Sequence, residues 1–187
     1  MYETSDIRNG LKIEFDGQPY VVTYFQFVKP GKGTAFTRTK LKSLTSGNVL
    51  DRTFRTGEKL QPADIEENEM QYLYPDGNMR VFMDTSSYEQ VMIENPVLGD
   101  DAKWLVDEMM VRVLFWRGKP INIELPNFVE LEITYCEPGV KGNTATGASK
   151  SAELSTGATV NVPLFVEQGE TIKIDTRTGE YVERVRK

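Results

Sequence analysis

Histidine is absent from the 187 residues, which removes Ser–His and Cys–His dyads and imidazole zinc sites. The single cysteine, Cys136, cannot form an internal disulfide, and this favours a reducing compartment. No apolar run approaches the roughly 18 residues that span a membrane. The first ten residues also lack the basic start and apolar run of a signal peptide. We therefore expect a cytoplasmic protein without membrane contact.

Positive charge is scarce and is concentrated in one segment. The chain has a net charge of −6, yet residues 29–55 hold seven basic residues and one acidic residue. Residues 56–126 hold 14 acidic and six basic residues. A polyanion such as RNA would be attracted to the first segment and repelled by the second, so it would bind in one orientation. A solvated strand face rich in Lys and Arg explains the same pattern, and charge alone does not separate the two interpretations.

The first 64 residues have the pattern of a small SH3-like barrel. Val, Tyr, Phe and Thr alternate with polar residues in short segments that turn residues separate, which predicts strands. The expected strands span residues 11–15, 19–28, 34–44 and 49–56. This density of short strands is typical of such a barrel.

Residues 65–126 have the pattern of an OB-like barrel. The acidic residues 62–69 predict a linker, and the sequence Pro75-Asp76-Gly77-Asn78 predicts a hairpin turn. Apolar residues spaced for one helical face predict a helix at residues 98–110. The expected strands are 70–74, 79–83, 110–116 and 121–125. Strands with one short helix among them are typical of this barrel type.

Residues 127–187 predict a third all-β unit. The expected strands are 128–135, 158–162, 171–175 and 181–185. Residues 141–156 are small, polar and rich in glycine, and we expect a long mobile loop there.

Lys32 is the strongest candidate for a functional side chain. It lies between Gly31 and Gly33 at a predicted hairpin tip, and Pro30 stiffens the entry to the turn. Neighbours without side chains leave the ammonium unshielded and let backbone approach a phosphate closely. An ordinary solvated turn lysine would give the same local sequence. A phosphate-binding P-loop is excluded, because Gln26 stands where that motif needs glycine and Gly33 where it needs Ser or Thr.

The remaining candidates are better explained by structure than by chemistry. The pairs Glu66/Glu67 and Asp100/Asp101 have no companion ligands, which favours solvated charge over a metal or acid–base site. Cys136 has no basic neighbour in sequence, which favours a buried, inert thiol. The residues most simply explained as core are Trp104, Met109, Met110, Phe115 and Trp116. Core is also the first explanation for Tyr24, Phe25, Phe27 and Phe36, although this group could include a stacking platform for bases.

Two long motifs and two shorter ones resemble one known family. The sequence Phe27-Val28-Lys29-Pro30-Gly31-Lys32-Gly33, with Ala35-Phe36, Arg38 and Lys40-Leu41-Lys42 after it, resembles the modified loop of bacterial elongation factor P. The spacing of Lys150, Ala152, Gly157, Val160, Val162-Pro163, Val166 and Gly169 is similar to that family's C-terminal signature. Also typical of the family are Pro126-Asn127-Phe128-Val129-Glu130-Leu131 and Asp175-Thr176-Arg177-Thr178-Gly179-Glu180-Tyr181. The resemblance covers the whole chain.

The resemblance implies an all-β protein of three small barrels in an L: a KOW/SH3-like barrel at 1–64 and OB folds at 65–126 and 127–187. It implies a tRNA-shaped translation factor that binds both ribosomal subunits beside the peptidyl-tRNA and relieves stalling on consecutive prolines. Such a factor would position the CCA end of the tRNA without a catalytic residue, cofactor or metal of its own. We expect it to act as a monomer.

The resemblance also implies roles for individual residues. Lys32 falls on the lysine that a dedicated enzyme modifies, commonly with a β-lysyl group. The loop expected to contact the tRNA is Lys29, Pro30, Gly31, Lys32 and Gly33, and the basic face toward the tRNA is Arg38, Lys40, Lys42, Arg52 and Arg55. The loop Gly142, Asn143, Thr144 and Ala145 falls on the segment that approaches the small subunit and messenger. Many members carry Asp where this chain has Asn143.

Two other functional classes fit part of the sequence. A single-strand RNA chaperone with OB folds would bind free RNA with a steep salt dependence, but the acidic middle segment argues against it. An enzyme that uses a carboxylate pair is disfavoured because histidine and metal-spaced clusters are lacking.

Overall fold

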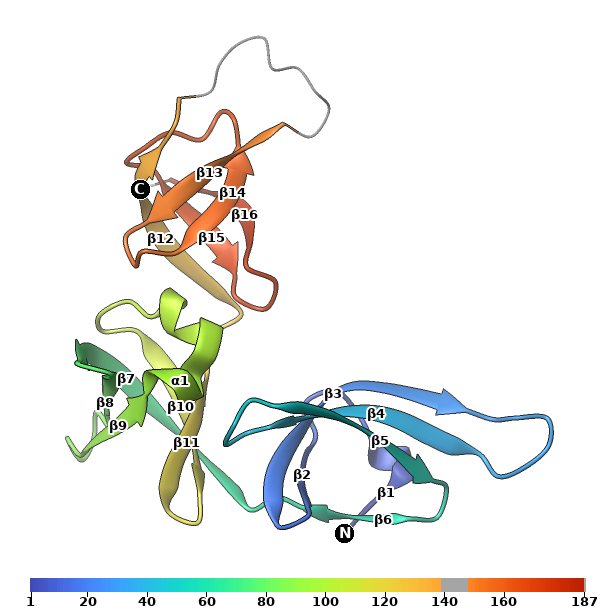
Figure 1. The fold of residues 1–187 in the computed structure, drawn as a ribbon. Coiled ribbons are helices and arrows are strands. Elements are labelled where there is room, and N and C mark those ends of the chain that lie inside the picture. The colour runs from blue at the N-terminus through green and yellow to red at the C-terminus, as the bar shows by residue number, and fades with distance from the viewer. Residues whose placement is uncertain (139–147, 187) are drawn as a thin grey trace.

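A computed structural model describes residues 1–138 and 148–186. Strands dominate the described residues and form three antiparallel sheets, each of which curls around its own core (Figure 1). We call the units built on these sheets the first, second and third domains. No helix in the described residues is long and apolar enough to cross a membrane.

The first domain is a six-stranded sheet in the order β1-β6-β2-β3-β4-β5. Its strands are β1 Tyr2–Glu3, β2 Lys12–Phe15, β3 Gln18–Val28, β4 Phe36–Ser43, β5 Val49–Arg55 and β6 Lys59–Pro62. A 3-10 helix, η1 Thr4–Asp6, follows the first strand. Alternation along the strands places Ile13, Val22, Leu41 and Phe54 in a common core.

The second domain is a five-stranded sheet in the order β11-β10-β7-β8-β9. Its elements are β7 Ile65–Asp76, β8 Met79–Met83, β9 Gln90–Glu94, α1 Asn95–Leu98, η2 Gly99–Trp104, β10 Met110–Trp116 and β11 Lys119–Glu124. The third domain is a five-stranded sheet in the order β14-β13-β12-β15-β16. Its strands are β12 Phe128–Cys136, β13 Ser149–Leu154, β14 Thr159–Pro163, β15 Thr171–Asp175 and β16 Glu180–Val185.

Three predicted elements were wrong. The helix expected at 98–110 is instead a four-residue α-helix followed by the 3-10 helix η2, because Gly99 turns the backbone to φ +57° and ends α1. The acidic segment 62–69 is largely strand β7, with Glu66 to Glu69 paired to β10 and their side chains exposed. Strand β13 occupies 149–154 of the predicted loop, and its small Ala152 is fully buried.

The three domains form an L, in which the second and third lie along one arm and the first extends sideways as the other (Figure 1). Apolar contacts join each neighbouring pair. Leu44 of the first domain packs with Leu114 and Ile121 of the second. Trp104, from η2 of the second domain, is buried in the core of the third.

Candidate RNA-contacting hairpin

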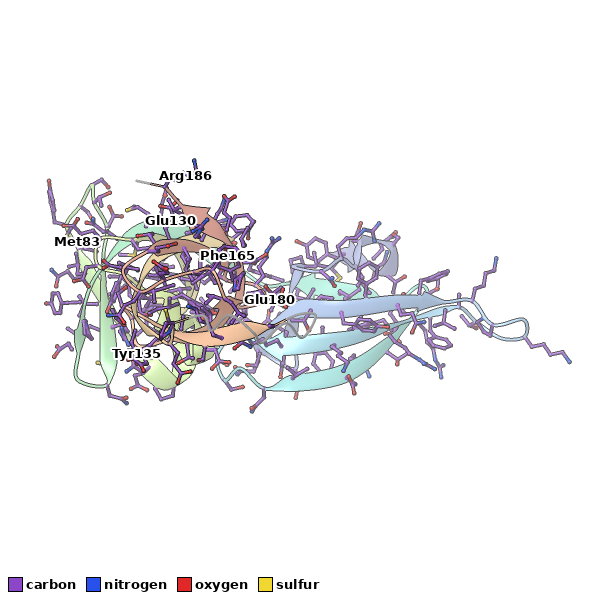
Figure 2. All side chains as sticks on the ribbon, turned by 90° about the horizontal axis from the view of Figure 1, so that it is seen from above. Met83, Glu130, Tyr135, Phe165, Glu180 and Arg186 are labelled. Atoms are coloured by element: carbon purple, nitrogen blue, oxygen red, sulfur yellow. The ribbon has the colours of Figure 1, made fainter. Side chains whose placement is uncertain are left out.

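Strands β3 and β4 form the longest hairpin of the first domain and project away from the other two domains (Figures 1 and 2). Their last paired residues are Val28 and Phe36, so residues 29–35 form the connecting loop. Thr, Val, Tyr and Phe dominate β3, and these residues suit an extended, pleated backbone. The hairpin therefore carries the loop of Lys32 to the outer end of its arm.

Lys32 lies exposed in this loop. A side chain on Gly31 would meet no other atom within 4 Å, so open space lies beside Lys32. Gly33 has φ +104°, a conformation that residues with a Cβ rarely adopt, and the turn therefore requires glycine there. Lys29 is also exposed, whereas Pro30 is partly buried. The five loop residues predicted to act together are contiguous at the tip, and the Lys32 side chain is exposed to solvent.

A basic face runs along the hairpin behind the tip. On β4 the exposed Arg38, Lys40 and Lys42 alternate with the buried Thr37, Thr39, Leu41 and Ser43. Arg55 of β5 stands opposite Phe36 and therefore shares the face of Arg38. A hollow on this face is lined by Thr34, Phe36, Arg38, Thr53 and Arg55. Two guanidiniums beside hydroxyl groups in a hollow are groups that bind phosphate oxygens well.

Arg52 does not lie on this face, although the sequence analysis placed it there. It stands opposite Thr39, whose hydroxyl donates a 2.6 Å hydrogen bond to the Arg52 carbonyl oxygen. Its guanidinium carbon lies 5.2 Å from the ring centroid of Phe15 and 5.4 Å from that of Phe54, on the other side of the sheet. The signal was available in the sequence, because residues 52 and 55 are an odd number apart and cannot share a face of a regular strand.

Sequence reasoning missed a cluster of charges that joins the first and second domains. The Lys12 ammonium lies 3.0 Å from a carboxylate oxygen of Glu67 and 3.0 Å from one of Glu124, and Arg112 approaches the same two carboxylates. Burial lowers the pKa of Lys12, but its hydrogen bonds to Glu124 and Glu67 outweigh burial and raise it above 10.5. The hydrogen bond from Lys12 lowers the pKa of Glu67 below its ordinary value.

The same junction contains one further ion pair and a half-buried carboxylate. Arg117 of the second domain lies 3.3 Å from Glu14 of the first. The sequence analysis predicted solvated charge for Asp100 and Asp101. Asp100 is exposed as predicted, but Asp101 is half-buried. Burial raises the pKa of Asp101, and the nearby charge of Lys42 partly opposes that rise. The basic arm is thus fastened to an acidic domain by opposite charges.

The other candidates take structural positions. Cys136 is buried and its thiol faces the Val166 carbonyl oxygen at 3.9 Å. Across residues 1–138 and 148–186, no three Cys, Asp or Glu side chains gather in a way that could hold a metal ion. The predicted messenger loop, Gly142, Asn143, Thr144 and Ala145, lies outside the described residues.

Comparison with known proteins accounts for all three domains. The KOW-like domain of elongation factor P matches residues 3–60, the OB domain of that factor matches residues 65–123, and its C-terminal domain matches residues 129–184. Elongation factor P of Coprothermobacter proteolyticus is 53% identical over 185 residues, which cover 99% of this chain and 100% of the relative. The chain belongs to the elongation factor P family. The factor from Natranaerobius thermophilus is 54% identical over 186 residues and covers 100% of this chain and 99% of its own length.

A solved structure agrees with this family fold. Eukaryotic translation initiation factor 5A from Methanococcus jannaschii superposes with a TM-score of 0.51 and 20% identity, covering 67% of this chain and 90% of that protein. The elongation factor P fold predicted from the sequence, a KOW-like barrel followed by OB-type barrels, is confirmed. The chain is therefore a translation factor of this family.

Proposed function

We propose that this protein binds the ribosome beside the peptidyl-tRNA and promotes peptide-bond formation at consecutive prolines. The observation that carries the proposal is the exposed Lys32 at the outer end of a projecting hairpin, on a protein shaped as an L (Figure 1). An L of three linked barrels can follow the outline of a neighbouring tRNA, with the Lys32 loop at the acceptor end. Family membership supports a role in elongation.

The proposed mechanism is positional. Proline is a constrained nucleophile, so the reacting ends of two tRNAs drift out of alignment. A cation held near the CCA end restricts that drift through hydrogen bonds to phosphate and ribose oxygens. Restricting the geometry of two reactants can lower a barrier by several kcal/mol without new covalent chemistry. The ribosome remains the catalyst, and the factor contributes no catalytic residue and no cofactor.

The basic face of the hairpin anchors the acceptor stem in this proposal. Arg38 and Arg55 line its hollow, and Lys40 and Lys42 continue the face toward the second domain. Phosphate contacts fix register and orientation without reading sequence, which suits a factor that must act on many tRNAs. Arg52 is not part of this contact, because it covers two aromatic rings on the other side.

Three further assignments belong to the same proposal. A dedicated enzyme extends Lys32, which lengthens its reach and adds hydrogen-bond donors. The segment Gly142, Asn143, Thr144 and Ala145 approaches the small subunit and messenger, where the amide of Asn143 can hydrogen-bond bases. The protein acts as a monomer with domains at 1–64, 65–126 and 127–187.

The decisive variant is Lys32→Ala, tested by the yield of a reporter protein that contains consecutive prolines. We expect yield to fall to that of cells without the factor, with an unchanged thermal unfolding midpoint because Lys32 is exposed. Lys119→Ala is the matched control, since Lys119 is an exposed lysine at the β10–β11 turn of the second domain. Wild-type yield from Lys32→Ala would refute the proposal.

A further inference from the structure

The β3–β4 hairpin has a second face that the phosphate contacts leave unused. Phe27 stands opposite Thr37, which in turn stands opposite Phe54, so the three residues form a row across three strands. This row lies on the side of the sheet away from Arg38 and Lys40. Thr37 and Phe54 are buried, whereas the Phe27 side chain, near the tip, is 61% exposed.

The aromatic rings around Phe27 already have cationic partners. The guanidinium carbon of Arg8 lies 5.8 Å from the ring centroid of Phe25, and that of Arg38 lies 5.5 Å from that of Phe36. Arg52 covers Phe15 and Phe54 in the same way. Among the described residues, no cation lies over Phe27 and no ring stacks on it. Phe27 is thus an open aromatic surface within a cationic region.

We propose that Phe27 is a stacking site for an unpaired RNA nucleobase. The inference rests on the proposed function and deepens it: the basic face contacts phosphates while the opposite face receives one base. An exposed ring offers a flat surface to any base without reading its identity. Arg8 and Arg52 on the same side provide charge for the phosphates that flank the base. This cationic surrounding favours RNA over a protein partner.

A purely structural role for Phe27 predicts different behaviour from a stacking role. As a cover for the buried Thr37, the ring contributes apolar area, and leucine supplies most of that area. As a stacking platform, the ring contributes a π face that leucine lacks and tyrosine keeps. The pair Phe27→Leu and Phe27→Tyr therefore separates the two roles.

The experiment measures the Kd of full-length variants for ribosomes halted at consecutive prolines, beside Phe165→Leu as a matched control. Phe165 is an exposed phenylalanine of the third domain, 59% exposed and labelled in Figure 2. Phe27→Leu should bind about 5- to 150-fold more weakly, the range for loss of one stacked base. Phe27→Tyr should stay within about twofold of wild type, because it keeps the stacking ring. Phe165→Leu should bind as wild type does.

A second readout identifies the partner. Short-wavelength ultraviolet light applied to the bound Phe27→Trp variant should crosslink position 27 to one RNA nucleotide, which primer extension maps. Wild-type binding by Phe27→Leu would overturn the inference, as would a crosslink to ribosomal protein. The inference would also be overturned if the intact mass of Phe27→Leu showed that Lys32 had lost the modification that the wild type carries, because that loss would then account for the weaker binding. Lys32→Ala, assayed in parallel for rescue, reports on the proposed function independently of Phe27.

Discussion

Replacement of Trp104 by alanine tests how the second and third domains are held together. Trp104 belongs in sequence to η2 of the second domain, yet it is 2% exposed and packs into the core of the third. Its ring edge lies beside the turn between β15 and β16, where a Cβ on Gly179 would be 3.6 Å from it. The Lys103 ammonium lies over the same ring, 4.9 Å from its centroid.

The size of the effect follows from this burial. Truncating a buried Trp to Ala costs about 3–5 kcal/mol through lost transfer free energy and the cavity left behind. A domain's whole stability is roughly 5–15 kcal/mol, so the third domain of Trp104→Ala should be marginally stable. The equilibrium constant for its opening should rise roughly 150- to 5,000-fold.

Hydrogen exchange read by mass spectrometry is the appropriate assay, because it localises the change. Amides of β12 and β15 should lose protection, while those of β3 and β4 should keep it. Trp116→Ala is the control, since Trp116 packs at the junction with the first domain and lies outside the third core. Loss of protection confined to β7 and β10 would refute the reasoning, because Trp104 would then serve only its own domain.

Three further predictions concern the junction and the tip. Lys12→Met should lower the free energy of unfolding by about 1 kcal/mol in urea titrations at pH 7. Because Glu67 has a lowered pKa and Lys12 a raised one, this loss of stability should vanish as pH falls below 4.5 or rises well above 10.5. A loss that does not depend on pH would contradict the role of the ion pair. Because the pKa of Asp101 is raised, its own contribution to stability should fall as pH rises above 3.8; the melting temperature of Asp101→Asn relative to wild type should therefore rise with pH, and a pH-independent difference would count against this. Gly33→Ala should reduce polyproline rescue and lower the melting temperature, because φ +104° costs a residue with a Cβ about 1–3 kcal/mol; Gly31→Ala, which has open space, should melt and rescue as wild type does, and equal rescue by both would contradict the role of the turn.

The sequence was sufficient to predict what depends on local pattern. The β3–β4 hairpin, the exposure of Lys32 and the outward direction of Arg38 follow from turn residues and period-two alternation, and the structure has them. Membership of the family followed from motifs that span the chain. Arg52 was misplaced because charge was counted by segment and not by strand face.

Contacts between domains could not be predicted from the sequence. The sequence predicts Trp104 as a core residue but does not say of which domain, and only the folded chain shows that the core is that of the third domain. The expected helix failed partly for the same reason: beyond Gly99, which ends α1, the apolar residues serve two cores, with Leu105 in the second and Trp104 in the third. Lys12 and Glu67 are 55 residues apart, so no local pattern links them.

The position of Lys32 on the ribosome is the most direct test of the central claim. A cryo-electron microscopy structure of the wild-type protein on a ribosome halted at consecutive prolines would show it. We predict that the Lys32 side chain, or the group attached to it, lies within hydrogen-bond distance of the CCA end of the peptidyl-tRNA. A bound protein whose Lys32 points away from that end, or that occupies a site remote from the peptidyl-tRNA, would contradict the account.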